Sequence, residues 1–198
     1  MNIEPVTLEG RHVRLEPLSL DHHLALSEAG MHEDLWRLNP TPVRTSEEMR
    51  AYIEEALLSQ ERGTMLPFAT IEKSSGLAIG STRYGNIEMA HRRLEIGWTW
   101  ITPSWQRTAV NTEAKYLMLR HAFEQLGCMR VEFKTDVLNE RSRNAILRLG
   151  AKEEGIFRRH MLTSTGRIRD SIFFSIIDTE WPDVKANLEL RLDGPTSR

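Results

Sequence analysis

The spacing of hydrophobic and polar residues changes once from a strand repeat to a helix repeat, between residues 94 and 126. Residues 94–100 alternate with a period of two, which is typical of a strand. Thr102-Pro103 ends this run, because proline cannot continue the hydrogen bonds of a strand. From about Asn111 to Gly127, buried-type residues recur every three or four positions, which predicts a helix and its end. The stretch therefore predicts a strand, a polar loop and a long helix.

The polar loop, residues 106–111, leads directly into the predicted helix. The first backbone N–H groups of a helix lack partners within the helix and lie at the positive end of its dipole, so they can bind an anion. The loop has neither the Gly-Lys-Ser/Thr of a Walker loop nor the glycines of a dinucleotide-binding fingerprint. Spacing alone favours an ordinary connection, with Asn111 or Thr112 as the helix cap.

The same patterns predict the remaining elements. Helices are expected over residues 21–37 (with a break near Gly30), from Thr45 or Ser46 to Gly63, over residues 140–149 with Asn139 as cap, and after a Thr179 cap. Strands are expected over residues 12–17, 67–72, 77–84, 128–137, 151–161 and 167–177. This order predicts an α+β (mixed α/β) fold with a mostly antiparallel, twisted sheet of six to seven strands. The strands on either side of the long helix are expected to be parallel neighbours.

Composition and charge narrow the function classes. The 198 residues are 40% hydrophobic and 27% charged, as in ordinary globular proteins. We expect a single domain over residues 1–193 and a flexible tail at 194–198. A net charge of −2 gives no drive toward nucleic acid or acidic membranes, and neither a long apolar run nor a signal peptide is evident. The single cysteine, Cys128, excludes an intrachain disulfide and a cysteine-rich zinc site. These features favour a cytoplasmic protein without a metal ion.

Four segments carry a family resemblance: Leu94-Glu95-Ile96-Gly97-Trp98, Gln106 to Asn111, Asn139 and Ser142 before Leu149-Gly150, and Gly166-Arg167 followed by Asp170. In this order they resemble the Gcn5-related N-acetyltransferase (GNAT) superfamily, and within it the RimJ/RimL-like branch that acetylates ribosomal-protein N-termini. The resemblance covers residues 15 to about 177. It implies helices on both faces of the sheet, a central parallel pair of strands splayed around the cofactor, and a two-helix lid at residues 21–63.

The resemblance also implies an activity: transfer of an acetyl group from acetyl-CoA to a primary amine, by direct attack through a tetrahedral intermediate. The amine could belong to a protein N-terminus or to a small molecule. The implied cofactor-binding residues are Trp100, Ile101 and Thr102 for the pantetheine, Arg107, Thr108, Ala109, Val110, Asn111 and Thr112 for the pyrophosphate, and Asn139 and Ser142 on the opposite side. Arg107 would add a counter-charge to the backbone amides.

Two residues are candidates for the chemistry. Glu95, expected on the same strand face as Gly97 and Thr99, is the candidate general base, directly or through water. The alternatives are a pair with a neighbouring arginine, Arg92 or Arg93, or simple exposure. Ser142 is the candidate partner of the leaving thiolate, and its alternative role is the third residue of a helix capped by Asn139. The helix has no tyrosine, so a tyrosine acid is excluded there.

Two departures from the family pattern motivate a rival hypothesis: the absent tyrosine and the missing glycines of the loop. Ala109 and Asn111 stand where the family's loop has glycines. If the backbone at Ala109 needed a positive φ, alanine would cost on the order of 1–2 kcal/mol. The rival function is a non-catalytic coenzyme A-binding sensor or interaction module with the same fold. The exposed strands of the last hairpin are also compatible with a homodimer.

Overall fold

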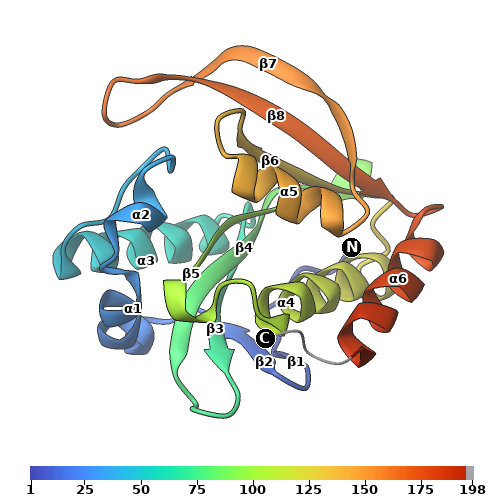
Figure 1. Cartoon of the computed structure of the whole chain (residues 1–198), viewed down its shortest axis with the longest axis horizontal. Helices are drawn as coiled ribbons and strands as arrows, with labels where there is room; N and C mark the ends of the chain where they lie inside the picture. Colours follow the sequence, from blue (N-terminus) through green and yellow to red (C-terminus); the bar gives the residue numbers. More distant parts are fainter. Residues whose placement is uncertain (195–198) are drawn as a thin grey trace.

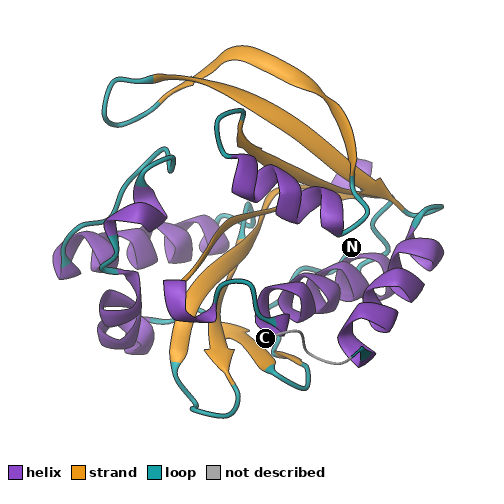
Figure 2. Ribbon diagram, in the orientation of Figure 1, coloured by secondary structure: helices purple, strands orange, loops and turns teal. Residues whose placement is uncertain are grey.

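The computed structural model describes residues 1–194, which form one mixed sheet with helices on both faces (Figures 1 and 2). The strands are β1 (Leu8–Glu9), β2 (Val13–Pro17), β3 (Leu66–Glu72), β4 (Ala78–Glu88), β5 (Arg93–Ile101), β6 (Arg130–Asp136), β7 (Lys152–Leu162) and β8 (Ile168–Ile177). The helices are α1 (His23–Gly30), α2 (Glu33–Trp36), α3 (Ser46–Glu61), α4 (Ala109–Arg120), α5 (Glu140–Arg148) and α6 (Trp181–Asp193), and a π-helical turn (His121–Gln125) extends α4. Apart from Gly194, the predicted tail lies outside the described residues.

The predicted fold class is confirmed, but the sheet has one strand more than expected. Its order within residues 1–194 is β1-β2-β3-β4-β5-β6-β8-β7, and the β5–β6 pair is parallel whereas the other neighbours are antiparallel. The extra strand, β1, has two residues and pairs Leu8 with Leu15. Two residues are too few to show an alternating pattern, which is why the sequence did not reveal this strand.

The two faces of the sheet carry separate hydrophobic cores. One core joins α4 and α6 to the sheet and contains Phe68, whereas the other joins α1 and α3 to the sheet and contains Ala69. Successive strand residues point to opposite faces, so neighbours such as these belong to different layers. The second core fixes the lid, residues 21–63, to its face of the sheet (Figure 1). None of the helices within residues 1–194 is long and apolar enough to cross a membrane.

The central parallel pair opens after only three residue pairs. Pairing of β5 with β6 ends at Glu95↔Glu132, and Figure 1 shows the two strands separating beyond this point. On its other edge β5 remains paired with β4. The expected parallel, splayed pair is therefore present, and within residues 1–194 one edge of β5 has no strand neighbour after Glu95.

A β-bulge in β5 changes which side chains share a face. Ser81 pairs with Trp100 and Arg83 pairs with Gly97, so Trp98 and Thr99 together face one β4 residue. Trp98 takes a positive φ of 50°. As a result Ile96 lies in the α4 core and Trp100 in the lid core. The expectation that Glu95, Gly97 and Thr99 share one face is wrong, because the bulge inverts the alternation after Gly97.

Two predicted helix caps also differ from the structure. Helix α4 begins at Ala109, and the Thr108 hydroxyl accepts a hydrogen bond from the Val110 N–H at 3.3 Å. Thr108, rather than Asn111 or Thr112, is therefore the cap. Helix α6 follows Glu180 rather than Thr179 and has Pro182 in its first turn. The predicted caps Thr45 and Asn139 are confirmed by hydrogen bonds to the third residue of their helices.

Candidate active site

A cleft of about 1310 Å³ lies where β5 and β6 separate. Its walls come from the lid, β5, β6, the loop before α4, helix α5 and the β7–β8 hairpin. The predicted site residues that line it are Glu95, Trp100, Ile101, Arg107, Thr108, Asn111, Asn139 and Ser142. Segments that are far apart in the sequence thus meet in one cavity.

Four predicted cofactor residues do not line this cleft: Thr102, Ala109, Val110 and Thr112. The Thr102 N–H donates to the Ile79 carbonyl at 2.8 Å, so the sheet already uses this amide. The Val110 side chain is buried in the α4 core. For Ala109, Val110 and Thr112, the predicted contact is through backbone amides at the start of α4 rather than through side chains.

In the loop before α4 the residue with a positive φ is Arg107, not Ala109 or Asn111, which stand where the family has glycines. Arg107 has a positive φ of 62°, whereas Ala109 and Asn111 belong to α4 and have no positive φ. The expected strain at Ala109 is therefore absent. Gln106 Nε2 donates to the Ile101 carbonyl at 2.7 Å, and the Thr108 hydroxyl donates to the Trp105 carbonyl at 2.8 Å. These bonds leave the exposed Arg107 side chain beside the positive end of the helix dipole.

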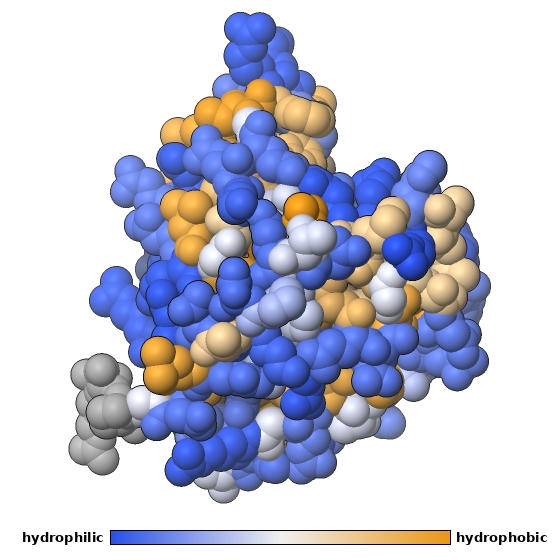
Figure 3. Space-filling view, turned by 90° about the vertical axis from the view of Figure 1, so that its right-hand side faces the viewer, coloured by the Kyte–Doolittle hydropathy of each residue, from blue (hydrophilic) through white to orange (hydrophobic). Residues whose placement is uncertain are grey.

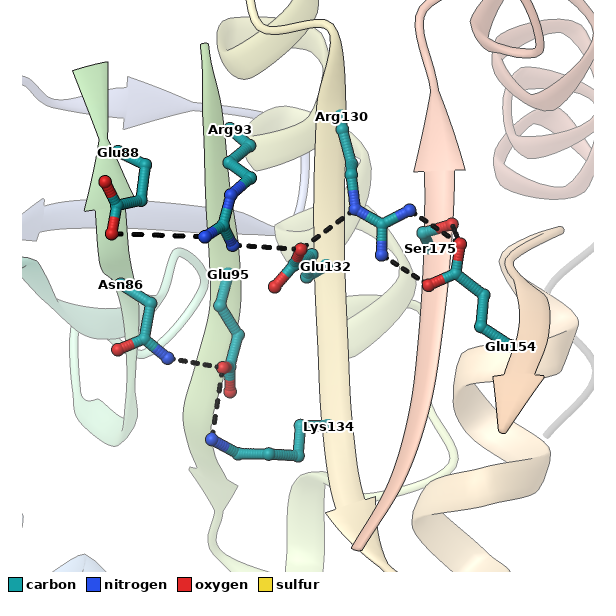
Figure 4. Close-up of polar contacts among 9 residues, drawn as sticks. All are labelled: Asn86, Glu88, Arg93, Glu95, Arg130, Glu132, Lys134, Glu154 and Ser175. Atoms are coloured by element: carbon teal, nitrogen blue, oxygen red, sulfur yellow. Dashed lines mark hydrogen bonds and ion pairs between the residues drawn. The ribbon is translucent and has the colours of Figure 1, made fainter. Parts of the chain in front are cut away.

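Glu95 is a buried carboxylate with one occupied and one open oxygen. Its Oε2 atom accepts from Asn86 Nδ2 at 2.7 Å and lies 3.3 Å from Lys134 Nζ (Figure 4). Within residues 1–194, Oε1 has no hydrogen-bond partner. A Cβ atom added to Gly97 would lie 2.9 Å from Oε1, so glycine makes room for this side chain.

Neither alternative foreseen for Glu95 is found in residues 1–194: its side chain is only 3% exposed, and its ion pair is with Lys134 rather than with Arg92 or Arg93. Arg93 binds Glu132 at 3.1 Å and approaches Glu88 at 3.9 Å. Figure 4 shows these residues in a row of paired charges that crosses the sheet beside Glu95. The sequence did not reveal Lys134 as the partner, because β5 and β6 are far apart in the sequence and the positions that meet depend on how the two strands pair.

Asn139 and Ser142 lie at the start of α5, on the opposite wall. Asn139 Oδ1 accepts from the Ser142 N–H at 3.0 Å, which confirms the capping role of Asn139 and places Ser142 at the third helical position. That bond uses only the backbone of Ser142. Its half-buried side chain lines the cleft, so the hydroxyl remains available to a ligand.

Lys115 also lines the cleft, although it was not among the predicted residues. It is 6% exposed, and its Nζ donates to the Thr82 and Thr99 hydroxyls at 2.9 and 2.5 Å. Burial lowers the pKa of this amine to about 7. The sequence held one signal: Lys115 lies four residues after Asn111, on the same face of α4.

Charges of both signs surround the part of the cleft below the lid and the hairpin. The charged lining residues there are Asp34, Arg37, Arg44, Glu48, Glu55, Lys134 and Arg169. Arg169 is buried, and its Nε donates to the Ser171 hydroxyl at 3.1 Å. Such a mixed lining gives no overall preference for an acidic or a basic acceptor.

The sequence profile of the acetyltransferase (GNAT) domain matches residues 12–152. Over 110 residues the chain is 31% identical to the Bacillus subtilis (strain 168) protein named "Putative ribosomal N-acetyltransferase YdaF", covering 56% of this chain and 59% of that protein. The chain thus matches less than two thirds of the length of this relative. The predicted resemblance to the GNAT superfamily is confirmed, and the similarity to this relative supports the RimJ/RimL-like branch.

Solved structures agree over almost the whole chain. A GCN5-related N-acetyltransferase from Brucella melitensis superposes with a TM-score of 0.90 at 35% identity, covering 96% of this chain and 86% of that one. Mycobacterium smegmatis RimJ in complex with CoA-disulfide superposes with a TM-score of 0.80 at 24% identity, covering 94% and 95%. The second likeness is one of fold.

Proposed function

This chain belongs to the acetyltransferase (GNAT) family, and on that premise we propose that it moves an acetyl group from acetyl-CoA to a primary amine. The observation that carries the proposal is the open Oε1 atom of the buried Glu95, held at the point where β5 and β6 separate. A carboxylate fixed by two partners at one oxygen can receive a proton at the other.

The residues of the cleft fit acetyl-CoA, which would supply an activated acetyl thioester. The unpaired edge of β5 after Glu95 offers backbone groups to the pantetheine amides. The start of α4 offers N–H groups and the positive end of a helix dipole to the pyrophosphate, and Arg107 adds a cation. The ordinary backbone at Ala109 and Asn111 removes the strain that was one of the two grounds for a module without catalysis.

Glu95 and Ser142 have separate roles in this proposal. Glu95 takes the proton of the acceptor amine, directly or through a water molecule. Lys134 and Asn86 hold its Oε2 atom and thereby orient Oε1. Ser142 donates a hydrogen bond from its free hydroxyl to the departing thiolate. Glu95 belongs to strand β5 and Ser142 to helix α5 on the opposite wall, so the acceptor and the thiol meet from different sides of the cleft.

Similarity to YdaF makes the α-amine of a ribosomal protein the first acceptor to test. The mixed charges below the lid also admit small amines, so the test needs a panel. Thiol release from acetyl-CoA is measured with N-terminal peptides of ribosomal proteins, polyamines, amino acids and antibiotic amines. Calorimetry with coenzyme A runs in parallel on the same protein.

Amine-dependent thiol release together with acetylated product supports the proposal. Coenzyme A binding without turnover on any amine favours the sensor or interaction module. Absence of both heat and a thermal shift at millimolar acetyl-CoA contradicts both functions.

A further inference from the structure

Lys115 is a buried amine whose only hydrogen-bond partners within residues 1–194 are two hydroxyls. Thr82 from β4 and Thr99 from the β5 bulge accept its bonds, and they contact each other at 2.7 Å. No carboxylate of the described chain lies within ion-pair distance of its Nζ atom. Hydroxyls solvate an ammonium group but do not neutralise it, so a positive charge here lacks a counter-ion.

The other charged groups around this part of the cleft do not supply that counter-ion. Seven other charged side chains line it. They are Arg107 from the loop before α4, Glu140, Arg141 and Arg148 from α5, Glu95 from β5, Lys134 from β6 and Arg169 from β8. Most of them are cations, and Glu95 is already bound to Lys134. The buried carboxylate of α4, Glu113, accepts from the backbone of residues 11–13 instead.

The position of Lys115 indicates which ligand could neutralise it. Lys115 lies one helical turn after Asn111 on the face of α4 that lines the cleft. Arg107, Thr108 and Asn111, at the start of α4, line the same cleft as Lys115. The first N–H groups of α4 lack partners within the helix and can bind an anion. An anion bound at that end would share the cleft with an amine that is only 6% exposed, so water would screen their attraction little.

We propose that Lys115 is a further cofactor-binding residue, which takes up a proton when the phosphate groups of coenzyme A bind at the start of α4. This inference rests on the proposed function, because it needs coenzyme A to bind in this cleft. Burial holds the pKa of the free amine near 7. A nearby polyanion raises that pKa, so binding and protonation favour each other. Affinity for coenzyme A should therefore fall about tenfold per pH unit above neutrality, until the pKa of the bound form is reached.

The test measures protons rather than turnover. Coenzyme A is titrated into the protein by calorimetry one pH unit above the pKa of Lys115, in buffers with different enthalpies of ionisation. The slope of the binding heat against buffer enthalpy gives the number of protons taken up. Wild-type protein should take up close to one proton more than Lys115→Met. Lys152→Met is the matched control, because this 73% exposed lysine pairs with Glu180 and does not line the cleft.

A phosphate-free analogue, acetyl-pantetheine, identifies the anion responsible. It should bind without the additional proton, since it lacks the pyrophosphate. Equal proton uptake from coenzyme A in wild type and Lys115→Met would overturn the proposal, as would the same uptake with acetyl-pantetheine. If Lys115→Met does not fold, binding of coenzyme A to wild type without proton uptake still refutes it. Failure of wild type to bind coenzyme A at any pH refutes the proposed function as well, which distinguishes the two failures.

Discussion

The two sides of the β5–β6 separation each hold a buried charge, but only one of these charges has a partner of opposite sign. Beside β6, Glu95 is bound by Lys134 and Asn86. Beside α4, the amine of Lys115 meets, among the residues that the structure describes, only the hydroxyls of Thr82 and Thr99. Burying a charge is costly unless it is paired. The paired carboxylate is therefore complete in the free protein, whereas the amine is completed by a ligand.

This difference separates the two halves of the proposed reaction. A carboxylate held at one oxygen is ready to act on an acceptor. An amine near neutrality can change its charge when the cofactor arrives. The cleft thus holds one group whose charge stays the same, Glu95, and one whose protonation changes when the cofactor binds, Lys115.

Removal of the Glu95 carboxylate should have the largest effect. We expect Glu95→Gln to lower kcat about 100-fold or more, because the amide cannot accept the proton, while acetyl-CoA affinity stays unchanged. Thiol-release kinetics and calorimetry measure the two quantities. Glu132→Gln is the control, since Glu132 belongs to the neighbouring row of paired charges and does not line the cleft (Figure 4). Unchanged turnover in Glu95→Gln would remove the base role.

Loss of the Glu95 partner should destabilise the fold. Lys134→Met leaves a buried carboxylate with one hydrogen bond, from Asn86. We expect the free energy of unfolding to fall by on the order of 2 kcal/mol, less than for a fully buried pair, because the Lys134 side chain is 16% exposed. Urea unfolding near neutral pH measures it, and a change below a few tenths of a kcal/mol would contradict the pairing.

Replacement of Lys115, the buried amine beside α4, should raise the free energy of unfolding rather than lower it. Lys115→Met removes an amine without a counter-ion, so the cofactor-free protein should gain about 1 kcal/mol near pH 7. The folded pKa of about 7 lies below the usual 10.5, so the unfolded chain binds more protons between these values. Wild-type stability should accordingly rise with pH across this window by up to about 1.4 kcal/mol per unit. Unfolding at several pH values should give a flatter profile for Lys115→Met, and identical profiles would contradict the burial of a titrating amine.

The smallest effect is expected at the hydroxyls. Thr82→Val keeps the shape of the side chain but removes one acceptor of the Lys115 bond. We expect a loss of about 1 kcal/mol in the wild-type background, the typical value for one hydrogen bond. Combined with Lys115→Met the same change should cost much less, since the bond is already gone. Equal losses in both backgrounds would show that the bond contributes nothing.

Local patterns were sufficient to predict most of the fold. The strand predicted at residues 94–100, the helix after the loop and the caps Thr45 and Asn139 all depend on neighbours in sequence, and the structure confirms them. The parallel pairing around α4 followed from the handedness of crossover connections. The two-residue strand β1 was missed because its pairing, not its pattern, defines it.

The site was less predictable because its geometry depends on contacts between distant segments. The bulge at Trp98 requires the register of β4 against β5, and it moves Thr99 to the α4 side. The partner of Glu95 comes from β6, and the acceptors of Lys115 come from two strands. By contrast, the sequence did predict a polar loop before α4, and residues 106–108 of it line the cleft. It did not predict that Thr108 caps α4 or that Arg107 takes the positive φ.

The outer hairpin, β7–β8, makes no hydrogen bond or ion pair with the charged groups of Glu95 or Lys115 within residues 1–194. Strand β7 is exposed along most of its length, and apolar side chains of the hairpin, including Phe157 and Leu162, face solvent. Figure 3 shows apolar groups among polar ones near the top of the molecule, where Figure 1 places this hairpin. The homodimer expected from these strands stays a prediction, which sedimentation equilibrium can test.

A crystal structure of the protein with coenzyme A would test the central claim most directly. The account predicts that the pyrophosphate accepts hydrogen bonds from the backbone N–H groups of residues 108–112, while the thiol end lies between β5 and β6, near Glu95 Oε1 and the Ser142 hydroxyl. Coenzyme A bound outside the cleft, or with its pyrophosphate away from the start of α4, would contradict it.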